Sequence, residues 1–356
     1  MKRIMGRILA GAVFVLTIGL LTGCSDAGEV SYHDGESSVE DHYGEDVIVL
    51  DGDGNENAKA LQNDERGEIL LVERSTNHAW GHYDHGLFVD AQGKVYAYDF
   101  SRYPAYMPYD ENALTFIERL ELIRENCDEI CSFDEKFVRE VMELGGSLSP
   151  EDEFKKEEKM YDYGQNTLYF YQPKTQELLM VESTGDVDYT PKNKDAKKIA
   201  RTYEKYTDLY AQPIANAAYA QGIPTVYSTD DVVMRNYVAE GADAWVGKWA
   251  LETKAQLKAF AEQSGIPVDD VLADDNDPEY DGCTYFISVE AARQEESCGN
   301  PRGIWIHGNC IDFVSPDDTS VEEGKFVCYL AQIYKEDLTA DDTDLVDLNG
   351  TAWKKN

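Results

Sequence analysis

The order of strand-like and helix-like segments constrains the fold of this chain more than any other feature of its sequence. From residue 68 onwards, a strand-like run and a hairpin-like run come first, two helix-like runs follow, and a second hairpin precedes a long helix. Strict alternation of strands and helices would predict a doubly wound parallel sheet. The clustered order instead predicts an α+β fold, in which antiparallel sheets and hairpins pack with helices in two subdomains.

Residues 67–222 form the first predicted domain, an N-terminal α+β domain. Its strand-like runs alternate apolar and polar residues, and Gly93 and the stretch 173–176 supply turn residues for two hairpins. Its helix-like runs place apolar residues three or four positions apart, which puts them on one helix face. We expect strands and hairpins at 68–75, 86–100 and 167–184, and helices at 111–126, 133–146 and 193–212.

Residues 223–340 form the second predicted domain, a C-terminal α+β domain. It begins with a strand and a helix, and the helix is opened by a capping box of Thr253 and Gln256 and closed by Gly265. Four strand-like runs follow, and we expect them to form one small antiparallel sheet. The first strand and the helix are expected at 242–249 and 251–267, and the later strands at 283–290, 303–308, 310–315 and 326–336. Residues 341–356 form an acidic tail that we expect to be loosely packed.

The first 24 residues have the pattern of an export signal. A basic start is followed by an uncharged apolar run at 8–21, which is short for a membrane-spanning helix, and by Leu-Thr-Gly-Cys ending at Cys24. This ending resembles the lipobox of bacterial lipoproteins, in which the cysteine thiol receives a diacylglycerol and becomes the mature N-terminus. The resemblance implies a lipoprotein signal peptide at 1–23 and a protein anchored through Cys24 to the extracytoplasmic face of the cell membrane. The alternative is an ordinary secretory signal that happens to end in cysteine.

An acidic tether is expected between the anchor and the folded part, at residues 24–66. Residues 25–57 contain many Asp and Glu but no Lys or Arg, and too few apolar residues to offset the entropy of ordering. The whole chain has a formal net charge of −37. Such a surface repels nucleic acid and anionic lipid headgroups, so we expect neither as a partner. The membrane is expected to be a partner only through the lipid on Cys24.

Three histidines, His78, His82 and His85, lie close together in the sequence. Their surroundings favour a strand, on which His78, His82 and Asp84 point one way while His85 points the other. At about 3.3 Å per residue, His78 and His82 would lie roughly 13 Å apart, too far to share one metal ion. The sequence therefore predicts a structural hairpin with no cofactor. His82 and Asp84 are retained as two candidate metal ligands that would need partners from elsewhere in the chain.

A second candidate for chemistry is Cys310 with His307, the nearest approach to a nucleophile and base in the sequence. On a single strand these side chains would point to opposite faces, so they can meet only if the chain turns at Gly308 and Asn309. No third group that would orient the histidine is evident, and the simpler interpretation is a strand pair with a structural cysteine.

Six cysteines follow Cys24, and an even number in an exported protein permits disulfides. We expect some of the four late cysteines to form disulfides, because all four lie in or beside strands assigned to one small sheet. Cys127 and Cys131 stand apart from them and are expected to pair with each other or to stay reduced. The four late cysteines are Cys283, Cys298, Cys310 and Cys328.

These features favour a non-enzymatic binding or interaction module whose ligand is a protein or a small molecule. Residues 242–337 resemble small domains of uncharacterised lipoproteins from Gram-positive gut bacteria, in which Trp, Leu and Phe precede a Tyr-Phe-x-x-Val strand, here 285–289. That group has no established activity to carry over. One alternative is an extracytoplasmic hydrolase that uses a metal or a thiol. Another is a solute- or glycan-binding lipoprotein with tryptophans as stacking platforms, the candidates being Trp80, Trp245, Trp249 and Trp305.

Overall fold

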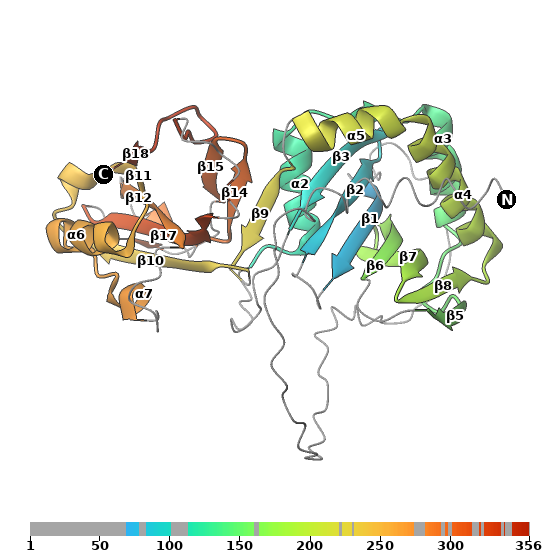
Figure 1. Ribbon diagram of the computed structural model, residues 1–356, viewed down its shortest axis with the longest axis horizontal. Coiled ribbons are helices and arrows are strands. Elements are labelled where there is room, and N and C mark those ends of the chain that lie inside the picture. The colour runs from blue at the N-terminus through green and yellow to red at the C-terminus, as the bar shows by residue number, and fades with distance from the viewer. Residues whose placement is uncertain are drawn as a thin grey trace, which may run out of the picture.

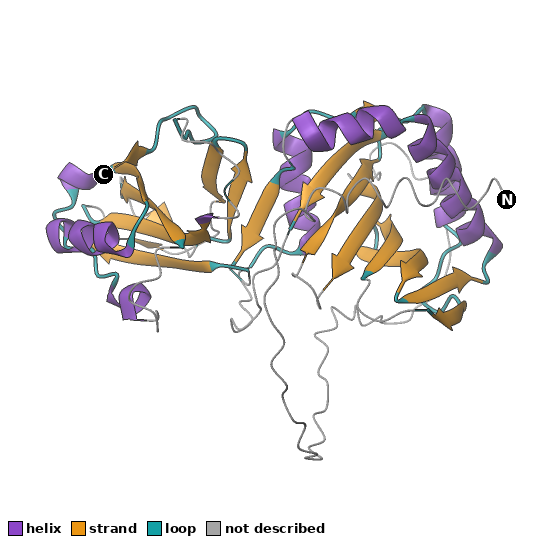
Figure 2. Cartoon of the chain, in the orientation of Figure 1, coloured by secondary structure: helices purple, strands orange, loops and turns teal. Residues whose placement is uncertain are grey.

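The chain folds around two sheets, and its first 68 residues lie outside the part that can be described. The computed structural model describes residues 69–77, 83–100, 113–159, 164–220, 223–229, 231–273, 282–292, 296–297, 301–314, 320–321, 324–335, 338 and 344–355. Within these residues helices are combined with mostly antiparallel sheets, so the predicted mixture of helices and strands is confirmed (Figures 1 and 2). The predicted signal peptide, Cys24 and the acidic tether all fall outside the described residues.

Within the described residues, eleven strands form the larger sheet, in the order β15-β14-β9-β3-β2-β1-β6-β7-β8-β5, with β4 paired to β3. Neighbouring strands are antiparallel except β3 and β9, which are parallel. The strands are β1 (Ile69–Asn77), β2 (Tyr83–Asp90), β3 (Lys94–Asp99), β4 (Cys131–Ser132), β5 (Phe154–Glu158), β6 (Gln165–Gln172), β7 (Glu177–Gly185), β8 (Val187–Pro191), β9 (Thr225–Ser228), β14 (Gly303–His307) and β15 (Cys310–Val314).

The smaller sheet has five strands in the order β10-β17-β12-β11-β18, and β13 and β16 form a separate pair. Its strands are β10 (Val233–Ala239), β11 (Gly247–Leu251), β12 (Cys283–Ala291), β17 (Phe326–Tyr334) and β18 (Lys354–Lys355), and the separate pair is β13 (Glu296–Ser297) with β16 (Ser320–Val321). The helices are α2 (Phe116–Asn126), α3 (Glu135–Gly145), α4 (Lys194–Leu209), α5 (Ala211–Ala220), α6 (Lys254–Ser264), α7 (Asp269–Ala273) and the 3₁₀ helix η2 (Asp243–Trp245).

Both faces of the larger sheet are covered by helices. Because side chains alternate along a strand, Leu71 and Val89 point to one face while Val72 and Phe88 point to the other. Helices α3 and α4 pack on the first face, where the core is mainly aliphatic. Helix α2 packs on the second face, which is rich in aromatic rings. The contact on the first face is close, since a Cβ added at Gly145 of α3 would lie 2.2 Å from the ring of Phe170.

The smaller sheet is also buried on both faces, but by different partners. Helices α6 and α7 cover one face through Leu257, Phe260 and Val271. The other face contacts β14 and β15 of the larger sheet, where Ile304 and Ile306 share a core with small-sheet residues. Trp305, between those two isoleucines, points instead into the core around α2. Strand β14 therefore lies between two cores, and it occupies the middle of the molecule in Figure 1.

This arrangement corrects the expectation that the four late strands form one small sheet. Only β12 and β17 do so, whereas β14 and β15 extend the larger sheet through β9. The reason is that β14 carries large apolar side chains on both of its faces, so it must be covered on both sides. Residues after 223 are consequently divided between the two sheets.

The end of the chain is ordered against both sheets, contrary to the expectation of a loosely packed tail. We call residues 345–355 the C-terminal strap. In this strap Val346 bridges to Cys310 of β15, and β18 pairs with β11 of the smaller sheet. Trp353 is buried between the sheets, and its indole N–H donates a hydrogen bond to the carbonyl of Ile311. The acidic residues of the strap do not prevent this packing, because Lys248 forms an ion pair with Asp347 at 2.8 Å.

Candidate functional site

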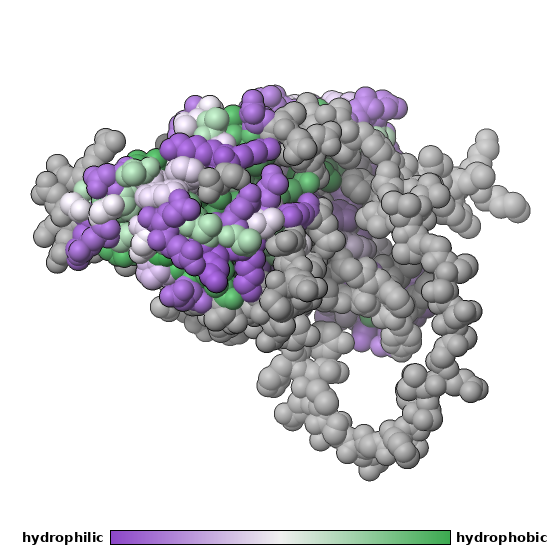
Figure 3. All heavy atoms as spheres, turned by 60° about the vertical axis from the view of Figure 1, so that its left-hand side comes forward, coloured by the Kyte–Doolittle hydropathy of each residue, from purple (hydrophilic) through white to green (hydrophobic). Residues whose placement is uncertain are grey.

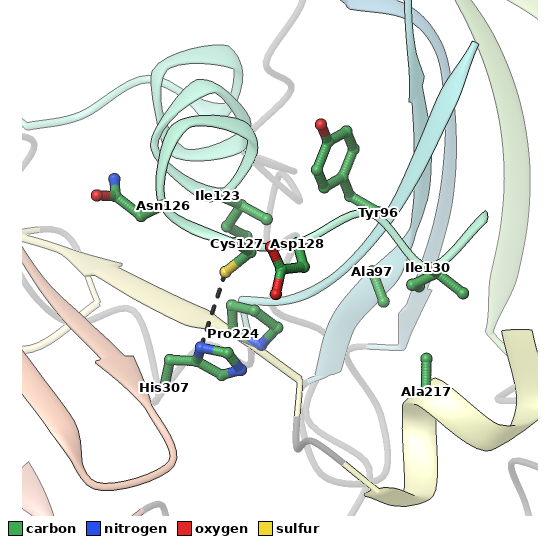
Figure 4. A pocket seen from close by; sticks show the side chains of 10 residues that line it. All are labelled: Tyr96, Ala97, Ile123, Asn126, Cys127, Asp128, Ile130, Ala217, Pro224 and His307. Carbon is green, nitrogen blue, oxygen red and sulfur yellow. Dashed lines mark hydrogen bonds between the residues drawn. The ribbon is translucent and has the colours of Figure 1, made fainter. Parts of the chain in front are cut away.

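A pocket of about 160 Å³ opens at the edge of β3, where the larger sheet is incomplete. The outer edge of β3 pairs with β4 at Val95 and with β9 at Asp99. Among the described strands, none pairs with this edge between those two positions. Helices α2 and α5 and the end of β14 surround the gap, as Figure 4 shows. The lining residues are Tyr96, Ala97, Ile123, Asn126, Cys127, Asp128, Ile130, Ala217, Pro224 and His307.

Helix α2 delivers Cys127 to this pocket. The helix begins at a capping box. The Thr115 hydroxyl accepts a hydrogen bond from the backbone N–H of Glu118, and the Glu118 carboxylate accepts one from the backbone N–H of Thr115. At the other end Cys127 is the C-cap, and its N–H still donates to the carbonyl of Ile123 at 2.9 Å. Its backbone is already extended, with φ −121° and ψ 153°, so the chain leaves the helix axis at the thiol.

The β14–β15 hairpin brings His307 to the same place. Its turn consists of Gly308 and Asn309, and Gly308 has a φ of +59°, which glycine adopts without steric cost. His307 and Cys310 are direct partners across the two strands. Cross-strand partners have side chains on the same face of a sheet. The chain therefore turns at Gly308 and Asn309, which is the condition under which His307 and Cys310 were expected to share a face.

The contact that forms is nevertheless a different one from the predicted pair. The Sγ atom of Cys127 lies 3.8 Å from Nδ1 of His307, and the two side chains face each other in Figure 4. These residues are 180 positions apart in the sequence. The sequence had linked Cys127 only to Cys131, and no local pattern could have revealed its approach to a histidine from another part of the chain.

The electrostatic surroundings keep the Cys127 thiol protonated. Burial, the carboxylate of Asp128 and the nearby thiol of Cys310 together raise the pKa of Cys127 to about 12. Burial also raises the pKa of Cys310, helped by Asp312 and Asp347. A thiolate is stabilised by positive neighbours, whereas Asp128 is a carboxylate and Cys310 is a second thiol. At neutral pH both side chains are therefore neutral thiols.

Of the two candidate metal ligands near the first hairpin, Asp84 lies in the described residues and His82 does not. Asp84 is 1% exposed, and its two carboxylate oxygens accept hydrogen bonds from Nε and Nη2 of Arg74 at 2.9 and 2.6 Å. Because the guanidinium of Arg74 already neutralises this carboxylate, Asp84 offers little electrostatic attraction to a metal cation. His85 faces away from Asp84 and contacts the ring of Tyr83, as the strand geometry predicted. His78 and His82 lie outside the described residues.

The expected disulfides do not form between the late cysteines that are described. Cys283 lies opposite Tyr334 on β17, and Cys328 lies six residues earlier on that strand. At about 3.3 Å per residue the two are roughly 20 Å apart, far beyond the 7 Å between Cα atoms that a disulfide tolerates. Cys310 lies in the other sheet, and Cys298 lies outside the described residues. Cys127 and Cys131 are also thiols and are not joined to each other.

The tryptophans proposed as stacking platforms are largely used in packing. Trp305 is only 2% exposed and belongs to the core around α2. Trp245 and Trp249 contact each other and Phe260, and the ammonium of Lys354 lies 4.6 Å from the ring centre of Trp249. Trp80 lies outside the described residues. On the face shown in Figure 3, apolar side chains are scattered among hydrophilic ones.

The described residues contain neither a membrane-spanning helix nor a cluster of metal ligands. No described helix is both long and apolar enough to cross a membrane. No three His, Cys, Asp or Glu side chains in the described residues gather closely enough to form a metal site.

Comparison with known proteins gives no further guidance to the function. The chain matches no protein-family model, no curated protein and no solved structure. The interpretation of the pocket therefore depends on its own chemistry.

Proposed function

We propose that this protein is a lipid-anchored, extracytoplasmic binding protein, and that the pocket beside β3 holds a small ligand without transforming it. The observation that supports binding over catalysis is the protonation of Cys127. This thiol is the nucleophile candidate of the pocket, and burial and Asp128 raise its pKa to about 12. Thiol enzymes instead lower the pKa of their cysteine, because the thiolate is the nucleophile.

The lining of the pocket mixes apolar and polar groups, and its volume of about 160 Å³ suits a ligand of only a few atoms. Ile123, Ile130 and Pro224 supply apolar surface, while Asp128, Asn126 and His307 supply a few polar groups. Small-molecule sites combine an apolar lining with a small number of polar groups that fix the orientation of the ligand. The walls come from four separate elements, α2, α5, β3 and β14, so a ligand here would also stabilise the contacts between them.

A thermal-shift screen against a small-molecule library tests the ligand proposal, because a bound ligand raises the melting temperature by mass action. The diagnostic variant is Ala217→Phe, which fills the pocket from the side of α5. The matched control is Asn216→Phe, at the neighbouring exposed position of the same helix. We expect pocket ligands to shift wild type and the control but not Ala217→Phe. Hits that shift all three proteins equally would place binding elsewhere and contradict the proposal.

The absence of catalysis is tested with panels of fluorogenic ester, amide and glycoside substrates. We expect the same background rate for wild type and Cys127→Ser, since a protonated thiol makes no attack. Turnover that depends on Cys127 would establish the thiol hydrolase that this proposal rejects.

Anchoring through Cys24 is tested by labelling cells with radioactive palmitate. The basic start, the apolar run and the Leu-Thr-Gly-Cys ending support this part of the proposal. We expect label in wild type and in the control Cys131→Ala, and none in Cys24→Ala. Equal labelling of all three proteins would exclude lipidation at Cys24.

We also propose that the two sheets are the centres of two subdomains that share the core around Ile304, Ile306 and Trp353. Helix α2 covers the face of the larger sheet that points away from this shared core, and α6 and α7 cover the corresponding face of the smaller sheet. Limited proteolysis should cleave the connections between the two sheets faster once Trp353→Ala has weakened the shared core. Identical digestion of wild type and variant would contradict this division.

A further inference from the structure

We propose that Cys127 and His307 together bind one soft metal cation of the copper(I) class, held between Sγ and Nδ1. This inference rests on the binding function proposed above and names the chemical class of one ligand. The two side chains come from α2 and β14 and face each other directly at the pocket (Figure 4).

The distance between the two atoms suits a shared ion. Metal–sulfur and metal–nitrogen bonds of about 2.3 and 2.0 Å place the two ligand atoms roughly 3.5 Å apart at a tetrahedral angle. The same bonds place them about 4.3 Å apart when the ion lies on the line between them. The observed separation of 3.8 Å lies between these limits, so an ion could enter with little movement of either side chain.

The ligand types select the class of ion. Thiolate sulfur and imidazole nitrogen suit soft and borderline ions such as copper(I), whereas magnesium and calcium require oxygen ligands. No three His, Cys, Asp or Glu side chains gather as a metal site in the described residues, so an ion that demands four protein ligands is poorly served. Copper(I) accepts two ligands, which is what this pair provides.

The charges around the pair favour a cation. Asp128 follows Cys127 in the sequence and lines the same pocket, and Cys310 lies opposite His307 on the hairpin. Burial is the main reason why Cys127 keeps its proton, and Asp128 adds a negative potential that also attracts a metal cation. A cation that replaces this proton gains the same electrostatic stabilisation.

The binding step balances without an oxidant or a reductant. The S–H bond of Cys127 breaks and its proton passes to water, while the sulfur lone pair forms the bond to the metal. Nδ1 of His307, in the tautomer that carries its proton on Nε2, supplies the second lone pair. One monovalent cation enters and one proton leaves, so the charge of the site and the oxidation state of the metal remain unchanged.

The test uses the full chain in detergent, with copper(I) supplied in ascorbate and a chromophoric chelator as competitor. We expect one tightly held copper(I) per protein. Cys127→Ser and His307→Gln should each weaken binding at least tenfold, whereas the control Cys131→Ser, outside the pocket, should bind like wild type. X-ray absorption of the wild-type complex should show one sulfur and one nitrogen neighbour. Absence of tight copper(I), or equal affinity in wild type and Cys127→Ser, would overturn the proposal.

Failure of the copper(I) proposal can be distinguished from failure of the small-ligand proposal. A protein that ignores copper(I) but whose small-molecule ligands are lost in Ala217→Phe would refute only the metal site. Thermal unfolding of each variant without metal shows whether it folds, so a variant that loses copper(I) binding and unfolds at the wild-type temperature supports the site. If neither Cys127→Ser nor His307→Gln folds, the X-ray absorption spectrum of the wild-type complex still shows whether copper(I) has one sulfur and one nitrogen neighbour.

Discussion

The two sheets bury their strands by opposite means. In the smaller sheet, the central strands β12 and β17 are buried along most of their length by apolar side chains. The larger sheet has one charged pair between its strands, Arg74 with Asp84, and a second lies against it, between Arg119 of α2 and Asp231 after β9. Both arginines also stack on aromatic rings, Arg74 on Phe116 and Arg119 on Phe100. The central strands of the smaller sheet avoid buried charge, whereas the larger sheet and the elements packed on it compensate for it.

The comparison shows where stability depends on exact partners. Apolar packing is non-directional, so a small sheet of this kind tolerates side chains of similar volume. A buried ion pair contributes little net stability, but removal of one partner leaves a charge without compensation in a region of low polarity. The larger sheet should therefore be sensitive to single charge changes and the smaller sheet to changes of volume.

The largest effect is expected for Arg119→Met. Arg119 is 3% exposed and lies 2.8 Å from the carboxylate of Asp231, which also accepts hydrogen bonds from Ser228. Removing the guanidinium should lower the free energy of unfolding by about 3–5 kcal/mol. Urea denaturation measures this loss. The double variant Arg119→Met/Asp231→Asn removes both charges and should recover much of it. A double variant as unstable as the sum of both single variants would refute the charge argument.

In the smaller sheet, Leu330→Ala should act through lost volume. Leu330 is fully buried in the core beneath α6, and its truncation should cost about 2–5 kcal/mol by transfer and cavity formation. The volume-conserving control Leu330→Met should cost less than about 1.5 kcal/mol. If Met were as harmful as Ala, the contrast between the two sheets would lose its basis.

A smaller effect is expected for Lys248→Met, at the C-terminal strap. Lys248 contacts Asp312 at 2.6 Å and Asp347 at 2.8 Å, yet it is 15% exposed and both carboxylates also accept backbone N–H groups. The loss should be about 1–3 kcal/mol, measured by urea denaturation. A change as large as that of Arg119→Met would show that this partly exposed network behaves like the buried pair.

The same network predicts a dependence on acid. Burial opposes ionisation of Asp347, but hydrogen bonds from Lys248 and the Thr351 N–H outweigh it and lower its pKa below the ordinary 3.8. Because the folded pKa is depressed, the stabilisation is complete above pH 3.8 and is lost as the pH falls through the folded value. The difference in stability between wild type and Lys248→Met should therefore shrink below about pH 4. Urea denaturation of both proteins at pH 3 and at pH 7 would measure this change. A constant difference would exclude Asp347 as the titrating group.

The smallest effect is expected at the outer edge of the larger sheet. Lys192 and Glu153 form an ion pair there, and both side chains are exposed. Water and salt screen such pairs, so Lys192→Ala should leave the midpoint of urea denaturation unchanged. A measurable loss would mean that exposed pairs contribute to this edge as buried pairs do.

Local patterns predicted the local elements well. The capping box of Thr253 and Gln256 opens α6, and Gly265 closes it with a φ of +73°. The turn at Gly93 joins β2 and β3, with a φ of +88° at the glycine. Such signals reside in residues that are neighbours in sequence, so a single chain is enough to recognise them.

Long-range contacts could not be predicted, because their partners are far apart in the sequence. The pair of Arg119 and Asp231 spans 112 positions, and the approach of Cys127 to His307 spans 180. Neither partner has a local signature, because an arginine or a cysteine on a helix has many alternative roles. The pocket itself arises from a gap in strand pairing on β3, which is a property of the strand order and not of any one segment.

The C-terminal strap has a consequence for how the chain is made. Trp353 packs against Phe286 and Phe313, yet it follows both in the sequence by dozens of residues. During synthesis from the amino end, the core between the two sheets therefore lacks the Trp353 side chain until residue 353 has been added. Completion of the core coincides with completion of synthesis through that residue. A chain that stops before residue 353 would leave the apolar surfaces of Phe286 and Phe313 without this partner.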